Sequence, residues 1–345
     1  MKKIVIEVDG VKTRRPVPQT WDELTLAQYL GVCDCILTNW GALGIFDENI
    51  LPVMRQNLFY IITNTDKKFW DKVKDAHAEY AEYAEDTEIG EIFFTSQLSV
   101  VVGLTNFLFK RRSTPTGFEY EAHIRRTVCP YKVVHYEAQK HIREMTIQAA
   151  KQTLTSVKRE YERSIKELKR LFKDCKEITW YAPADMLENI TFYELCALFQ
   201  KYEAYVTKGY KDVDLCQLIA ILYRPSKAFS ENNRITEYEG DRRIPYMGSE
   251  STAEARAQKA KLLHPSVKRA ILCWFLGCRT ALFESPRFAP LFEGEGSDDP
   301  LKLGMYKVLF ALQETSPYNA QTAANENAWM ALTYLAHKVL ENQKE

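Results

Sequence analysis

Residues 136–176 read YEAQKHIREMTIQAAKQTLTSVKREYERSIKELKRLFKDCK, and the expected architecture depends on this stretch. Charged and polar side chains fill most of it, and apolar side chains recur only as an intermittent seam. Such a pattern is typical of a solvated helix that bridges two lobes, or of a coiled-coil arm. We therefore expect one long charged helix with a lobe on either side. The seam consists of Met145, Ala149, Val157, Tyr161, Leu168 and Phe172.

The chain on the N-terminal side of this helix opens with a predicted β-hairpin. Ile4, Ile6 and Val8 alternate with other residues, and Asp9-Gly10 is a dipeptide that favours a type I′ turn. Pro16 and Pro18 are expected to end the strand pairing, since proline cannot donate to the ladder. Three parts follow from the pattern: an N-terminal lobe of hairpin plus helices over 1–135, the charged helix or linker over 136–177, and a C-terminal helical lobe over 178–345.

Both lobes contain a recognisable helix start. Thr25 with Gln28, and Thr191 with Glu194, have the spacing of a capping box. In a capping box the side chain of each residue accepts a hydrogen bond from the backbone N–H of the other. The surrounding residues 18–29 and 183–195 align with one inserted residue. Two interpretations stay open, an internal duplication and two independent uses of the same helix-start pattern. The fold class that we expect is mainly α, with two helical lobes, a small N-terminal β-hairpin and a long charged connecting helix.

Composition and charge narrow the classes of function. The 345 residues contain 46 Lys and Arg against 46 Asp and Glu, so the formal net charge is zero. This balance argues against a surface built as a whole for nucleic acid or for an anionic membrane. Residues 92–109 carry no charge and have the minimum length of a transmembrane helix. Their Thr, Ser, Gln and Asn side chains favour a buried helix instead, and no membrane association is expected.

No catalytic signature is found in the sequence. The nucleophile elbow, the phosphate-binding glycine loop and the zinc-protease pattern are all missing. Cys33 and Cys35 would point to different sides of a helix, so one ion cannot be held by both thiols. We expect a protein that is not an enzyme and that uses no metal and no cofactor.

The strongest polar signal is a basic segment over residues 110–132, in which aromatic residues are interleaved. It could contact a phosphate backbone, although Glu119 and Glu121 dilute its charge, so an exposed loop or a protein-binding surface is favoured. Trp21 and Leu24, just before the first helix, are interface candidates whose simpler explanation is core packing. The candidate interface residues are Lys110, Arg111, Arg112, Arg125, Arg126, Trp21 and Leu24.

Three stretches resemble proteins of tailed bacteriophages. These are VPQTWDELTLAQYL at 17–30, LCQLIAILYRP at 215–225 and AILCWFLGCRTALFESPRFAPLF at 270–292. They are similar to segments of the tail-assembly and virion-associated morphogenesis proteins. The resemblance implies a mainly helical, non-enzymatic protein whose partners are other phage or virion proteins, or copies of itself. It further implies a location in the host cytoplasm, with incorporation into the virion left open. The alternative function is a helical nucleic-acid-binding accessory protein that uses the basic segments 110–132 and 151–176.

Overall fold

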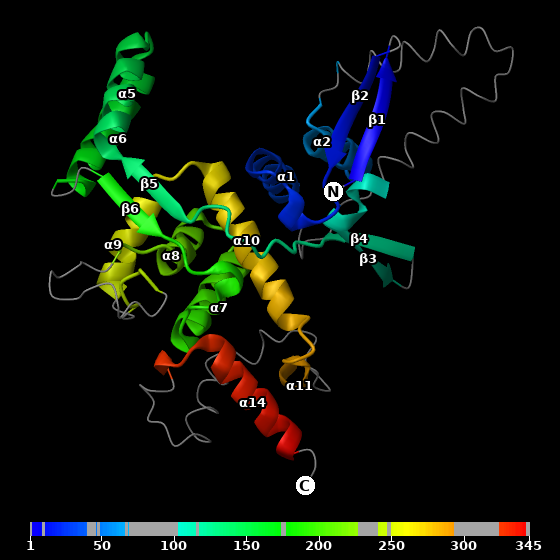
Figure 1. Cartoon of the computed structure of the whole chain (residues 1–345). Helices are drawn as coiled ribbons and strands as arrows, with labels where there is room; N and C mark the ends of the chain where they lie inside the picture. The colour runs from blue at the N-terminus through cyan, green and yellow to red at the C-terminus, as the bar shows by residue number, and fades with distance from the viewer. Residues whose placement is uncertain are drawn as a thin grey trace, which may run out of the picture. The chain divides into compact units, whose positions relative to one another are not determined.

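The computed structural model describes the residues 2–8, 11–39, 46, 49–65, 68, 103–114, 117–173, 177–226, 241–246, 250–292 and 324–342. Helices dominate them, and the strands form only two-stranded sheets (Figure 1). The predicted mainly α fold is confirmed. The chain divides into two compact units, unit 1 with Met1–Pro130 and Pro265–Ala281, and unit 2 with Tyr131–His264 and Leu282–Glu345.

Unit 1 begins with the predicted hairpin. The two strands pair antiparallel, with Val8 opposite Val11; the turn residues between them lie outside the described part of the chain. The pairing ends at Val17, directly before Pro18, as expected, but it runs through Pro16, which pairs with Lys3, so the expectation for Pro16 is wrong. In a two-stranded sheet the side without a neighbour has no partner for an N–H, so proline is tolerated there. The elements of unit 1 are β1 (Lys2–Val8), β2 (Val11–Val17), η1 (Trp21–Glu23), α1 (Leu26–Thr38), α2 (Leu51–Thr63), η3 (Asn106–Leu108), β3 (Phe109–Thr114), β4 (Gly117–Ala122) and the first part of α10 (Pro265–Phe283).

The first helix starts where the sequence predicts. The hydroxyl of Thr25 accepts a hydrogen bond from the backbone N–H of Gln28 at 3.3 Å, and the side chain of Gln28 accepts one from the backbone N–H of Thr25 at 3.0 Å. Tyr29, one residue on, is fully buried and donates its hydroxyl to the carbonyl of Ala270 in α10. The capping box therefore fixes the start of α1, and the tyrosine joins α1 to α10.

Unit 2 contains the helices that the sequence places in the C-terminal lobe, together with the charged stretch. Its elements are β5 (Val133–Glu137), α5 (Ala138–Lys151), α6 (Thr155–Leu171), β6 (Glu177–Tyr181), η4 (Asp185–Leu187), α7 (Phe192–Thr207), α8 (Asp212–Leu222), α9 (Glu250–Ala260), α11 (Ala289–Phe292) and α14 (Ala328–Asn342).

The single long helix expected over 136–177 is wrong. The chain forms α5, passes through Gln152 and Leu154 in extended conformation, and continues as α6, which packs against α5. The apolar seam has a gap between Ala149 and Val157. Because each half has only one apolar face, folding back lets the two faces cover each other, which a straight helix cannot do. We call residues 138–173 the arm.

A small sheet closes the base of the arm. β5 precedes α5 directly, and β6 follows the arm. The two strands are antiparallel, with Glu137 opposite Glu177 as the outermost pair. His135 lies between these carboxylates, with its Nε2 3.5 Å from Glu137 and 3.9 Å from Glu177. The chain thus enters the arm and leaves it at neighbouring positions of this sheet.

Two expectations concern membranes. Most of the uncharged stretch 92–109 lies outside the described residues, so its predicted burial is not tested. Within the described ranges, no helix combines the length and apolar character that a membrane span needs.

Candidate functional site

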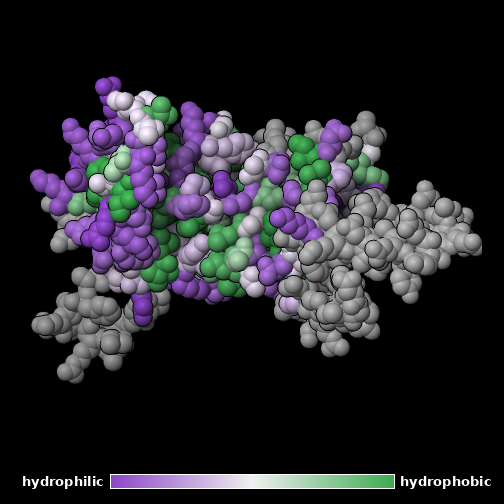
Figure 2. Space-filling model, turned by 90° about the horizontal axis from the view of Figure 1, so that it is seen from above, coloured by the Kyte–Doolittle hydropathy of each residue, from purple (hydrophilic) through white to green (hydrophobic). Residues whose placement is uncertain are grey.

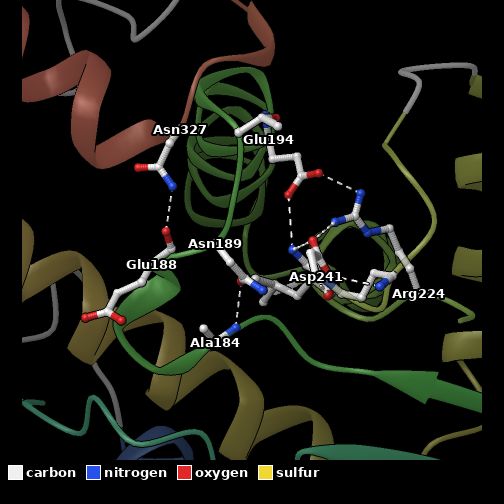
Figure 3. A network of polar contacts seen from close by, with 10 residues as sticks. Ala184, Glu188, Asn189, Glu194, Arg224, Asp241 and Asn327 are labelled. Carbon is white, nitrogen blue, oxygen red and sulfur yellow. Dashed lines mark hydrogen bonds and ion pairs between the residues drawn. The ribbon is translucent and has the colours of Figure 1, made fainter. Parts of the chain in front are cut away.

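The most concentrated group of charges in unit 2 is buried behind the N-terminus of α7 (Figure 3). The carboxylate of Glu194 accepts from Arg224 Nη1 at 2.6 Å and lies 3.4 Å from Arg243 Nη2. Arg243 also donates to both oxygens of Asp241, at 2.8 and 2.9 Å. The side chains of Glu194, Arg224 and Arg243 are at most 4% exposed. We call these four residues the charge cluster.

The sequence assigned one member of the charge cluster a different role. Thr191 accepts from the backbone N–H of Glu194 at 3.2 Å, as a capping residue does. The Glu194 side chain does not return the bond, because it turns inward to two arginines 30 and 49 residues further along the chain. The predicted second capping box is therefore only half formed. No sequence signal marked these partners, since their distance along the chain is large.

Electrostatics explain why the charge cluster is stable. Burial lowers the pKa of Arg224, and the Glu194 carboxylate opposes that effect. For Asp241, burial raises the pKa, but the hydrogen bonds and charge of Arg243 outweigh it and leave that pKa below the ordinary value. Two cations face two anions, which offsets much of the cost of burying them, although Arg224 Nε and Nη2 are buried without a hydrogen bond to any residue that the structure describes.

The charge cluster holds three segments together. Arg243 Nη1 donates to the carbonyl of Leu222 at the end of α8, and Ile244 N donates to Pro225 O. On the other side of α7, Asn327 Nδ2 donates to Glu188 O, and Phe192 N donates to Glu326 O (Figure 3). With its charges engaged internally, the charge cluster serves to position α7, α8 and residues 241–246.

Among the described residues, no group of three or more His, Cys, Asp and Glu side chains is placed to hold a metal ion.

The predicted interface residues do not form one surface. Trp21 and Leu24 are 2% and 4% exposed, which agrees with the packing explanation. Arg126 is 7% exposed, so its assignment to an interface is wrong. Its Nη1 donates to the carbonyls of Trp21 and Leu24 at 3.1 and 3.2 Å, and its guanidinium lies 4.4 Å from the Tyr29 ring centre. The preceding Arg125 is exposed and donates to His123.

Arg126 belongs to an extended segment, residues 123–128, that we call the strap. Trp21 Nε1 donates to His123 O at 2.6 Å, and Trp274 Nε1 donates to Thr127 O at 2.9 Å. A Cβ added to Gly277 would lie 2.1 Å from Arg126 O, so α10 touches the backbone of the strap. The strap is thus fixed inside unit 1 and is not a free basic loop.

The remaining predicted residues lie on β3, opposite acidic residues of β4. Lys110 pairs with Glu121 and Arg112 with Glu119, so charges of opposite sign share one face of this hairpin. Arg111, on the other face, stacks on Phe118 with its guanidinium 3.3 Å from the ring centre. The three basic residues are exposed, and two of them, Lys110 and Arg112, have a glutamate directly opposite.

A second group of exposed basic residues lies on the arm. Four of those on α6 recur at intervals of four, three and four residues, and hydrophilic residues dominate the end of unit 2 that carries the arm (Figure 2). We call this set the basic stripe. It consists of Arg159, Arg163, Lys166 and Arg170.

Protein-family models, curated proteins and solved structures contain no match to this chain.

The phage resemblance therefore rests on its three stretches alone. Structurally they lie in or next to α1, α8 and α10; α8 and much of α10 are buried, and α1 buries one face with Tyr29, Val32, Cys33 and Ile36. These stretches concern the packing of helices, and they include none of the basic stripe.

Proposed function

We propose that this chain is a non-enzymatic phage morphogenesis protein, a tail-assembly or virion structural component that acts in the host cytoplasm through protein–protein contacts. Its partners are other virion proteins or copies of itself. The observation that carries the proposal is the outward face of α14. Met330 and Tyr334, one turn apart, are 60% and 37% exposed. The same face continues towards the C-terminus with the polar side chains of His337 and Glu341.

The opposite face of α14 supports this proposal. Ala331, Leu332, Leu335 and Ala336 are buried, so the helix is already anchored in unit 2. Asn327 caps its start by accepting from the backbone N–H groups of Trp329 and Met330 at 3.0 and 3.2 Å. An exposed methionine and tyrosine on a fixed helix need little ordering on association, and the polar side chains of His337 and Glu341 beside them give the face a polar edge, as in a protein contact.

The charge cluster supports the same class of function. Its arginines and carboxylates bind one another, Arg243 also binds a backbone carbonyl, and burial keeps Glu194, Arg224 and Arg243 from solvent while Asp241 is 23% exposed. They stabilise a scaffold on which outward faces are presented. The resemblance of the three packed stretches to morphogenesis proteins agrees with a scaffold of this kind.

The test is the solution mass of the full chain by light scattering as the protein concentration is raised. We expect species larger than the 40.0 kDa chain. The variant Met330→Lys should shift assembly to higher concentration. Val53→Lys is the matched control, because Val53 is also 60% exposed but lies on α2. A single-chain mass at every concentration, or equal effects of the two variants, would count against self-assembly through α14.

A further inference from the structure

The arm carries a surface that the proposed function does not use. The members of the basic stripe lie within α6, and all are exposed. At 3.6 residues per turn, intervals of four, three and four keep them on one side of the helix. From Arg159 to Arg170 the stripe is about 16 Å long, at 1.5 Å per residue.

The opposite side of α6 is covered. Leu168 and Phe172 are 3% and 7% exposed, and the Phe172 ring lies 5.6 Å from the ring of Tyr136 at the base of the arm. The ammonium of Lys259 in α9 lies 5.5 Å from the Phe172 ring centre. An amphipathic helix that enters a membrane surface must offer its apolar face. Since the apolar face of α6 is packed, the helix presents its cations instead.

The glutamates of α6 lie beside the stripe and not within it. Three glutamates occur on α6, and at 100° per residue they fall on the flanks of the basic stripe, three or four residues from its cations. Among the residues that the structure describes, no ion pair includes a member of the stripe. The arm as a whole has more basic than acidic residues, so its surface keeps a positive charge.

We propose that the basic stripe of α6 binds the phosphate backbone of a nucleic acid. Protein interfaces are built around an apolar centre, whereas the stripe contains no apolar residue. A phosphate backbone needs only regularly spaced cations. The length of the stripe corresponds to about five phosphates of one strand, at 3.4 Å per phosphate along a duplex axis. Three of its four members are arginines, whose guanidinium groups fit phosphate oxygens.

Fluorescence anisotropy of the full chain with a labelled 20-base-pair duplex, and with a single strand of the same length, tests this proposal. Four phosphate contacts predict a slope of log affinity against log salt of about −3.6 for the duplex and about −2.8 for the single strand. Duplex affinity should therefore fall about 150-fold between 50 and 200 mM salt. The relative affinity for the two probes shows which form is preferred.

The double variant Arg163→Gln, Arg170→Gln should reduce the duplex slope by about 1.8. The matched control is Lys110→Gln, Arg112→Gln, which removes the same charge from the exposed strand β3. Circular dichroism checks that both variants keep their helix content. No binding at 50 mM salt, or an equal loss in the two variants, would overturn the proposal. Equally efficient competition by polyglutamate of the same total charge would also overturn it, because the stripe would then fit an acidic protein.

Discussion

Replacing Glu194 by glutamine keeps the shape of the side chain and removes one charge from the charge cluster. Each carboxylate oxygen faces a different arginine, at 2.6 and 3.4 Å, and both arginine side chains are fully buried. The substitution leaves two cations against Asp241 alone. Removing one partner of a buried ion pair costs about 3–5 kcal/mol, a large part of the 5–15 kcal/mol that stabilises a typical domain.

Hydrogen exchange of backbone amides measures this loss of stability for unit 2 separately. A single unfolding curve does not, because it combines the unfolding of both units. At about 1.4 kcal/mol per factor of ten, exchange in α8 should accelerate about 100- to 4,000-fold. The matched control is Glu203→Gln, an exposed glutamate on the same helix. Its effect should stay within about 0.5 kcal/mol.

A second substitution tests the cause. In the double variant Glu194→Gln, Arg224→Met, one cation and one anion remain, so we expect part of the lost protection to return. If Glu194→Gln changes exchange no more than Glu203→Gln, or if the second substitution adds its full cost, charge balance is not what stabilises the charge cluster.

Three further predictions concern single positions. The pKa of Asp241 is lowered, so the ionised carboxylate stabilises the fold fully above the ordinary pKa of 3.8, and this stabilisation is lost as the pH falls below that pKa. The thermal denaturation temperature of Asp241→Asn should therefore depend less on pH, between about 4 and 2, than that of the unaltered chain. Gly277→Ala should destabilise unit 1 by about 2–3 kcal/mol in urea unfolding, because the new Cβ collides with the backbone of Arg126. Gly103→Ala should be neutral or slightly stabilising in the same assay, because no atom lies within 4 Å of its Cβ. Arg126→Met removes the guanidinium donor from three carbonyls and should lower the free energy of unfolding by about 2–4 kcal/mol. Arg125→Met should lower it by well under about 1 kcal/mol. Equal urea midpoints for the two variants would contradict the role of the strap.

Features of the fold set by neighbouring residues could be predicted. The capping box at Thr25 and the pairing of β1 with β2 depend on residues a few positions apart. The mainly α class follows from apolar periodicity along each helix. The break between α5 and α6 was missed, because it arises from two apolar faces covering each other and not from a helix-breaking residue.

The candidate sites depend on distant partners and were harder to predict. Arg125 and Arg126 are adjacent and chemically identical, yet only Arg126 meets the carbonyl of Trp21, 105 residues away. Glu194 has the spacing of a capping residue, but two buried arginines outcompete the local bond. The basic stripe, by contrast, was recoverable from the sequence, since its four- and three-residue intervals are visible within segment 151–176.

The antiparallel pairing at the base of the arm has a consequence for how the chain can vary. Opposite residues of such a pair lie about 5 Å apart, so Glu137 and Glu177 could be joined by a two-residue turn. The arm is topologically an insertion in a β-hairpin. Related chains could lengthen, shorten or lose the arm without a change in the path of the rest of unit 2. A variant in which the arm is replaced by a short turn would show how stable the rest of unit 2 is without the contacts that the arm makes.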